Sequence, residues 1–314
     1  MASVGIVGAG LAGLLCGRVL AESGHDVVLF DKGRGPGGRL ATRRIDDARL
    51  DHGAQFFTTR SDRFAGLVTE WSAAGLVVEW TRGFGTDDGF PRYVVRDGMN
   101  ALAKHLAAGL DVRCSTLVFM VRRHPAGGWS ILLDDGSTHA VDAVVVAIPL
   151  PQAASVLIDT GVQLPAELRT IDYDRTLALL AVLDRAAQVP PPGGVQDADD
   201  VFSFVADNRM KGISAVPALT LHARAEWSLA HWDADREEVH GQLRRAAASW
   251  VGPASIVESQ VKRWRFATPQ RIWPELCWTA PHGPPLALAG DAFAGPRVEG
   301  AALSGLAAAQ ALLA

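Results

Sequence analysis

The first thirty residues combine two short apolar runs with a helical pattern. Residues 4–7 and 26–30 are largely apolar runs of strand length, and apolar residues recur at helical spacing from Leu11 to about Ser23. Runs of this length are typical of buried strands, whereas spacings of three and four residues are typical of a helix. The pattern therefore predicts a strand, a helix and a second strand in immediate succession.

Further strand patterns occupy the middle of the chain and its C-terminal end. Asp134-Asp135-Gly136-Ser137 is typical of a hairpin turn, and an apolar strand at 285–289 precedes a helix from about Gly300 to Leu313. The other strands predicted up to residue 156 cover 111–113, 117–122, 128–133 and 143–148.

Residues 157–283 show a different pattern, in which strands alternate with stretches rich in Trp and His. Their short connections favour antiparallel pairing, and a helix over 234–251 is expected to cover one face. The strands predicted here cover 177–183, 201–205, 218–223 and 257–264.

Composition narrows the class of protein. The 314 residues carry a formal net charge of −4, so nothing suggests a nucleic-acid or anionic membrane partner. No apolar run reaches the ~20 residues that span a bilayer, and the chain starts directly with a strand instead of a signal peptide. The 3 cysteines have no metal or redox spacing. We expect a cytoplasmic protein without a metal site.

The first strand is followed at once by the glycine pattern Gly8-x-Gly10-x-x-Gly13, and the second ends on Asp31. Gly8 permits a tight turn, Gly10 allows the main chain to approach a pyrophosphate, and Gly13 allows close packing of helix and strand. Asp31 is placed to accept hydrogen bonds from ribose hydroxyls. This order of elements predicts a dinucleotide-binding unit.

The loop after Asp31 favours a flavin dinucleotide over NAD. Lys32 to Arg39 is basic and rich in glycine, and Arg39 is suited to bind phosphate through two hydrogen bonds. Three later segments suit a ribityl chain and a ring edge: residues 50–57, Gly290-Asp291 and residues 298–302, which lie at the start of a helix.

These patterns together predict an α/β chain of two domains (α+β two-domain). Residues 1–75, 97–156 and 284–314 are expected to form a discontinuous, Rossmann-like FAD-binding domain. Residues 76–96 and 157–283 are expected to form a second, mainly antiparallel β-sheet domain for the substrate.

The motifs resemble those of the monoamine-oxidase superfamily of FAD proteins, over essentially the whole chain. Within it, the chain is most similar to the renalase-like branch, particularly its bacterial members. The segments that carry the likeness to this branch are 30–42, 50–58, 221–223, 226–228 and 263–267.

The resemblance implies noncovalent FAD, because Leu276-Cys277-Trp278 does not match the cysteine motif that tethers flavin in some relatives. It also implies that the main chain at Val118 holds the adenine. The residues expected to contact FAD are Gly8, Gly10, Leu11, Ala12, Gly13, Asp31, Lys32, Gly38, Arg39, Gly53, Ala54, Gln55, Phe56, Val118, Gly290, Asp291, Glu299, Gly300, Ala301 and Ala302.

The resemblance further implies a substrate. Renalase-like enzymes oxidise dihydronicotinamide dinucleotides reduced at the 2 or 6 position, and pass the electrons to oxygen with formation of hydrogen peroxide. The candidates for catalysis are Gln55, His222 and Trp264.

Aromatic residues could form a flat pocket, and the candidates are Trp227, Trp264, Phe266 and Trp273. Amine oxidases of the superfamily place a lysine near the flavin, and its motif is missing here. Lys211 and Lys262 are possible substitutes without motif support.

Two alternatives remain open. The first is an FAD enzyme that oxidises amines or desaturates small molecules, and the second is a flavin-binding protein without turnover. The residues separate the first alternative from the renalase-like reading poorly, because the cofactor motifs are common to the superfamily.

Overall fold

The computed structural model describes residues 1–293 and 295–314. The chain forms two compact units, each assembled from separate segments. Unit 1 comprises Met1–Gly38, Leu102–Asp172 and Pro269–Ala314, and unit 2 comprises Arg39–Ala101 and Tyr173–Thr268. The expected fold class is confirmed, because one unit holds a mainly parallel, Rossmann-like sheet and the other a mainly antiparallel sheet.

The sheet of unit 1 has the strand order β17-β18-β11-β1-β2-β7. Strand β1 pairs in parallel with both β2 and β11, so the chain order of the parallel strands reverses between β1 and β11. Doubly wound sheets bind their ligands at the carboxyl ends of the strands at such a reversal. The strands are β1 (Ser3–Val7), β2 (Asp26–Phe30), β7 (Asp111–Arg113), β11 (Ala143–Val146), β17 (Trp278–Thr279) and β18 (Leu286–Leu288).

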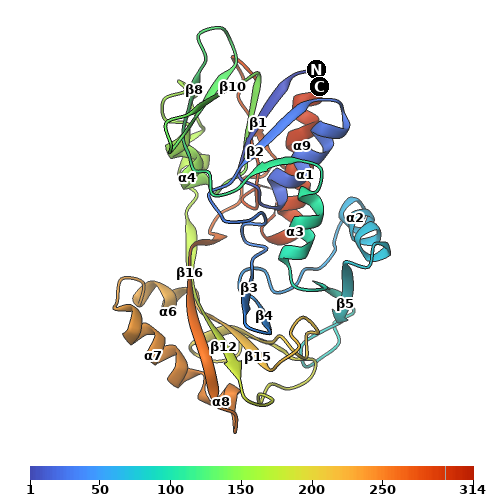
Figure 1. Cartoon of the computed structure of the whole chain (residues 1–314), viewed down its shortest axis with the longest axis vertical. Coiled ribbons are helices and arrows are strands. Elements are labelled where there is room, and N and C mark those ends of the chain that lie inside the picture. Colours follow the sequence, from blue (N-terminus) through green and yellow to red (C-terminus); the bar gives the residue numbers. More distant parts are fainter. Residues whose placement is uncertain (294) are drawn as a thin grey trace. The chain divides into compact units, whose positions relative to one another are not determined.

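Two long helices pack against each other in unit 1, namely α1 (Leu11–Glu22) and α9 (Arg297–Leu313) (Figure 1). Their main chains approach closely, because a Cβ on Gly305 would lie 2.2 Å from the carbonyl oxygen of Ala12. The remaining elements of this part of the chain are α3 (Asn100–Ala107), β8 (Val118–Arg123), β9 (Trp129–Leu133), β10 (Thr138–Val141), α4 (Leu150–Val156) and α5 (Ala166–Arg169). Strands β9 and β10 form the predicted hairpin around residues 134–137.

The main sheet of unit 2 has the order β13-β14-β15-β12-β16, and its β13-β14-β15-β12 ladder is antiparallel. Its strands are β12 (Tyr173–Leu183), β13 (Gly194–Gln196), β14 (Phe202–Asp207), β15 (Ala218–Ala223) and β16 (Ile256–Pro269). The predicted helix over 234–251 is instead two helices, α7 (Arg236–Ala246) and α8 (Ala248–Val251). The other elements are α2 (Asp62–Ala73), β5 (Val77–Thr81), β6 (Arg92–Val95) and α6 (Ala225–Ala230).

The two faces of this sheet are covered differently. Alternate residues of β12 and β15, such as Leu179 and Leu221, form a hydrophobic core with Val239 and Leu243 of α7. The opposite face packs against a hairpin that the sequence patterns did not predict, formed by β3 (Thr42–Ile45) and β4 (Ala48–Asp51).

The hairpin explains why the compact units differ from the expected domain boundaries. Residues 39–75 are expected in the Rossmann-like domain, whereas they lie in unit 2. Residues 157–172 and 269–283 are expected in the substrate domain, whereas they lie in unit 1. The apolar side chains of the hairpin, Ile45 and Leu50, are buried against Leu180 of β12 and Ala218 of β15. The assignment of FAD and substrate to particular domains stays a prediction.

Among the described residues, none of the helices is both long and apolar enough to cross a membrane. The three cysteines are free thiols. Cys16 is buried in α1, as expected for a core residue, and burial raises the pKa of its thiol to about 12. This thiol therefore stays protonated and unreactive.

Candidate functional site

Two of the three glycines in the Gly8-x-Gly10-x-x-Gly13 pattern are required by contacts within unit 1. Gly8 has φ +101°, and a Cβ there would lie 2.7 Å from the carbonyl oxygen of Ala147, just after β11. A Cβ on Gly13 would lie 2.0 Å from the carbonyl oxygen of Gly8. Any side chain at either position would push the first turn of α1 away from the ends of β1 and β11.

The third glycine, Gly10, has no such internal reason. Its φ of −74° suits any residue, and a Cβ there would meet no atom within 4 Å. A Cβ on Gly38 would meet only the Cα of Gly10, at 3.6 Å, and one on Gly290 would meet nothing. These glycines leave bare main chain facing space that the described residues do not fill, which fits a cofactor lying against the backbone.

The N-terminal end of α1 also fits an anionic group. Within the described chain, no side chain caps this helix and its first turn holds no acidic residue. The N–H groups around Leu11 and Ala12, together with the positive end of the helix dipole, are therefore available to a pyrophosphate. The amide of Gly37 donates to the carbonyl oxygen of Ala9 at 2.8 Å, which ties the basic loop to this turn.

Asp31 organises the same turn. Its Oδ2 accepts a hydrogen bond from the amide of Ala9, and its Oδ1 accepts one from the amide of Gly33, both at 2.7 Å. Each carboxylate oxygen can accept a second bond. Asp31 can therefore hold the loop and still meet ribose hydroxyls, as the sequence predicts.

The two basic candidates after Asp31 fall in different units. Lys32 is exposed in unit 1. Arg39 belongs to unit 2, where its Nη1 donates to the carbonyl oxygen of Ala267 at 3.1 Å and its guanidinium lies 5.7 Å from the ring centre of Tyr173. Its contact with phosphate stays a prediction.

The C-terminal candidates lie around the end of β18 and the start of α9. The amide of Gly290 donates to Ser304 Oγ of α9 at 2.8 Å, and Asp291 is buried beside it. Glu299 lies in the first turn of α9, and a Cβ on Gly300 would clash with the carbonyl oxygen of Gly295. Ala302 is fully buried, Ala301 is half-buried, and Val118 is buried in β8 next to a β-bulge.

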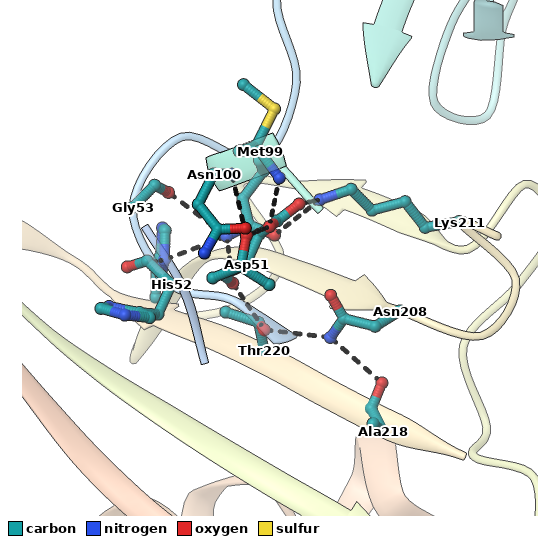
Figure 2. A network of polar contacts seen from close by, with 12 residues as sticks. Asp51, His52, Gly53, Met99, Asn100, Asn208, Lys211, Ala218 and Thr220 are labelled. Carbon is teal, nitrogen blue, oxygen red and sulfur yellow. Dashed lines mark hydrogen bonds and ion pairs between the residues drawn. The ribbon is translucent and has the colours of Figure 1, made fainter. Parts of the chain in front are cut away.

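Unit 2 contains a buried polar network centred on Asp51 at the end of β4 (Figure 2). Lys211 Nζ donates to Asp51 Oδ2 at 2.7 Å, and both side chains have 0% exposure. Asp51 Oδ1 accepts hydrogen bonds from Thr42 Oγ1 at 2.6 Å and from the amide of Met99 at 2.8 Å. Burial lowers the pKa of Lys211, and the facing carboxylate opposes this shift.

The main chain of this segment is fixed by the same network. Thr220 Oγ1 donates to the carbonyl oxygen of Asp51 at 2.9 Å, and Asn208 Nδ2 donates to Thr220 Oγ1 at 3.0 Å (Figure 2). Gln55 Nε2 also donates to the carbonyl of Asp51, at 2.7 Å, and to that of Gly53, at 3.2 Å. Since Gln55 Oε1 faces Lys211 Nζ at 3.4 Å, the whole amide is used inside unit 2.

Two histidines and a tryptophan meet beside this network. The carbonyl oxygen of His52 accepts hydrogen bonds from Trp264 Nε1 at 2.6 Å and from His222 Nε2 at 3.2 Å. The ring of His52 stacks on Trp264 with a centroid distance of 5.3 Å. Because His222 Nε2 carries the donated proton, its Nδ1 is an acceptor whenever the ring is neutral.

Both histidines are neutral at pH 7. Burial lowers the pKa of His222 to about 4, with a smaller contribution from the charge of Lys211. Burial lowers the pKa of His52 to about 3, and the charges of Lys262, His222 and Arg43 lower it further. Two of the three catalytic candidates, His222 and Trp264, are thus brought together around His52, with Gln55 adjacent.

The other aromatic candidates of unit 2 make different ring contacts, and Phe266 lies edge-to-face with Tyr173. Trp227 stacks on His231 at 3.9 Å and packs against the hydrophobic core with α7. Trp273 belongs to unit 1. Phe56 joins a separate aromatic cluster with Trp80, Phe84 and Phe204.

The sequence patterns did not predict several members of the network. Asp51 could have been noticed as an acid that ends a short apolar run, like Asp31. Thr42, Asn208 and Thr220 gave no signal, because their polar contacts join segments far apart in the sequence. For Lys211, the sequence suggests only a possible substitute for the lysine of amine oxidases.

The fold and the glycine turn define a two-domain, dinucleotide-binding protein. Residues 72–313 match the family described as flavin containing amine oxidoreductase, and residues 6–71 match the NAD(P)-binding Rossmann-like domain. The chain belongs to the flavin containing amine oxidoreductase family, which confirms the expected flavin cofactor and the class of oxidoreductases.

Named relatives match shorter stretches. The chain is 46% identical over 55 residues to hydroxyneurosporene desaturase of Rubrivivax gelatinosus, covering 18% of this chain and 10% of the relative. It is 39% identical over 65 residues to a Mycobacterium tuberculosis (strain H37Rv) protein named as a flavin-containing monoamine oxidase, covering 21% and 14%. These matches therefore span only about a tenth to a seventh of the relatives' own length.

Solved structures share the fold over the full length. A protein from Exiguobacterium sp. 255-15 named for protoporphyrinogen oxidase has a TM-score of 0.76 and 14% identity, covering 99% of this chain and 98% of the other. Putrescine oxidase bound to putrescine has a TM-score of 0.71 and 15% identity, covering 99% of both chains. At this identity, the likeness shows a common fold.

Proposed function

We propose that this protein is a renalase-like FAD oxidase, which removes a hydride from 2- or 6-dihydro-NAD(P) and releases NAD(P)+. The observation that carries the proposal is the charge state of the polar network in unit 2. Its two histidines are neutral, and the charged side chains at its centre, Asp51 and Lys211, are paired with each other. When bound, FAD supplies the hydride acceptor, and both electrons then reduce molecular oxygen to hydrogen peroxide.

A dihydronicotinamide suits such a network. Loss of hydride leaves an aromatic pyridinium ring and requires no proton transfer to a protein base. His222 Nδ1 would accept a hydrogen bond from the carboxamide of the substrate, since Nε2 is already bound to the carbonyl of His52. The neutral state of the ring makes this acceptor available at pH 7.

Two cations near His52 suit the phosphates of a dinucleotide. Lys262 and Arg43 both act on His52 through their charge, and Arg43 Nε is buried without an acceptor among the described residues. A phosphate oxygen would supply that acceptor.

Amine oxidation is the second candidate, supported by the family and by the fold shared with putrescine oxidase. A cationic amine must lose a proton before it can give up a hydride, so a base must be available to it. Asp51, the carboxylate of this network, is fully buried and paired with Lys211. Lys211 is held by the same ion pair, which leaves it poorly suited to the role of the amine-oxidase lysine.

Anaerobic stopped-flow mixing separates the candidates. The FAD-loaded protein is mixed in turn with 2-dihydro, 6-dihydro and ordinary 4-dihydro NAD(P), and with putrescine, while flavin absorbance is followed. We expect the 2- or 6-isomer to bleach the flavin about a hundredfold faster than the 4-isomer, because a shifted hydride carbon is misplaced by angstroms. Readmitted oxygen should restore the absorbance with one peroxide per flavin.

The outcomes are distinct. Fastest bleaching by putrescine would replace the proposal by amine oxidation. Fastest bleaching by 4-dihydro NAD(P)H would reject the renalase-like specificity, and no bleaching by any compound would favour a flavin-binding protein without turnover. In a His222→Gln variant, a higher concentration of the isomer should be needed to reach half of the maximal bleaching rate. His105→Gln, at an exposed position of α3, should leave this concentration unchanged.

A further inference from the structure

Trp273 lies in unit 1, in the segment that leads to β17. Its amide donates to the carbonyl oxygen of Ala292 at 2.7 Å, and it forms a parallel β-bridge with Phe293. Its main chain is thereby tied to the residues directly after Gly290 and Asp291.

The indole N–H of Trp273 is buried and has no acceptor among the described residues. Four other tryptophans of the chain donate this group to an oxygen at 2.6–3.0 Å, namely Trp80, Trp129, Trp250 and Trp264. A buried donor without a partner is strongly unfavourable, and native proteins rarely contain one. The unpaired indole N–H of Trp273 therefore points to an acceptor that the described residues do not provide.

The neighbouring residues indicate which acceptor this is. A Cβ on Gly290 would meet no atom of the described residues within 4 Å, so the chain next to the bridge faces space that these residues leave unfilled. This segment is the one expected to approach the flavin, and a flavin carries carbonyl oxygens, ring nitrogens and ribityl hydroxyls that accept hydrogen bonds. We propose that Trp273 is a cofactor-binding residue whose indole N–H donates a hydrogen bond to FAD. The inference concerns the cofactor and does not depend on which substrate is oxidised.

A comparison of apo and FAD-loaded protein tests this role. Trp273→Phe removes the donor, and Trp129→Phe is the matched control, because Trp129 donates to the carbonyl of Pro285 within the protein. We expect Trp273→Phe to raise the Kd of FAD roughly three- to tenfold, as for loss of one hydrogen bond. It should leave the midpoint of urea unfolding of the apo protein unchanged or higher, since an unpaired donor is removed.

The control should behave in the opposite way, lowering the urea midpoint of apo and FAD-loaded protein alike with little change in Kd. If Trp273→Phe also lowers both midpoints equally and leaves the Kd unchanged, the indole only packs or binds water, and the proposal is wrong. Because Phe is smaller than Trp, a second variant replaces Trp273 by benzothienylalanine, which keeps the ring shape and lacks the N–H. An unchanged Kd for FAD in this variant would equally overturn the proposal.

Discussion

The glycine turn of unit 1 and the polar network of unit 2 differ in how far their polar groups are already bonded within the protein. Around Gly10, the main chain is bare, and a Cβ at this position would meet no atom within 4 Å. The N-terminal end of α1 has no side-chain cap. Around Asp51, the side chains of Lys211, Thr42 and Thr220 and the amide of Met99 come from distant parts of the sequence and donate hydrogen bonds to this one residue. The first region leaves main chain open to a ligand, whereas the ion pair at the centre of the second is closed by contacts within the protein.

This difference bears on what each region can do. Bare main chain and a helix end bind a phosphate by geometry alone and provide no reactive group. A network of paired charges and neutral histidines provides fixed donors and acceptors on a rigid support. The two regions thus predict opposite responses to mutation: loss of cofactor binding in unit 1 and loss of folding stability in unit 2.

The largest effect is expected from breaking the buried ion pair. Lys211→Met leaves the Asp51 carboxylate buried without its cation, which typically costs about 3–5 kcal/mol. Urea unfolding should show this loss in the free energy of unfolding. Arg18→Gln is the control, because it removes an exposed pair with Glu22 and should cost under about 1 kcal/mol.

A double variant sharpens this prediction. Lys211→Met combined with Asp51→Asn removes both charges, and should recover part of the stability lost in Lys211→Met alone. If Lys211→Met costs no more than Arg18→Gln, the network does not stabilise unit 2 in the way its burial indicates.

The same difference explains what the sequence could predict. Gly8, Gly10, Gly13 and Asp31 lie within one strand-turn-helix-strand unit, so their spacing is readable along the chain. The network joins Thr42, Asp51, Met99, Lys211 and Thr220, whose proximity depends on the β3–β4 hairpin packing on the large sheet. No local pattern records such contacts, and the hairpin itself was missed because its four-residue strands carry arginines and little apolar alternation.

In the glycine turn, the second prediction separates two glycines of one motif. Gly13→Ala places a methyl group 2.0 Å from the carbonyl oxygen of Gly8, and overpacking of this kind costs about 1–3 kcal/mol. Gly10→Ala meets no protein atom, so the apo protein should lose less than about 1 kcal/mol while its affinity for FAD falls. Urea unfolding of apo protein and FAD titration give the two readouts. Unchanged FAD affinity in Gly10→Ala would mean that the open space is not a cofactor site.

A third prediction concerns the pH dependence of the free energy of unfolding, to which His222 contributes. His222 has a pKa of about 4 in the folded protein, below its ordinary value of 6.5. Between these values the unfolded chain binds the proton and the folded protein does not, so stability falls as pH drops from 6.5 towards 4. The linkage amounts to at most about 1.4 kcal/mol per pH unit, or about 2 kcal/mol down to pH 4.5.

His222→Gln should make this decline shallower, and His105→Gln, at an exposed position, should leave it as it is. His52 contributes a decline in the same direction, because burial lowers its pKa to about 3. The residual slope of the His222→Gln variant should therefore remain positive. Equal slopes of the unfolding free energy against pH in wild type and His222→Gln would show that His222 is not kept neutral by the fold.

A fourth prediction tests whether Arg39 contributes to cofactor binding, as the glycine turn does, or to stability, as the network does. Arg39→Ala should weaken FAD binding roughly tenfold if its guanidinium holds a phosphate, because hydrogen bonds to charged groups contribute about 1.5–3 kcal/mol. Its bond to the carbonyl of Ala267 lies within unit 2, and its loss alone should affect stability instead of affinity. Arg123→Ala is the control, since Arg123 lies over the ring of Trp129 and has no expected cofactor contact. Titration of apo protein with FAD, alongside urea unfolding of the same samples, separates the two roles. A drop in stability with unchanged affinity would assign Arg39 to the framework of unit 2, and the predicted phosphate contact would have to be abandoned.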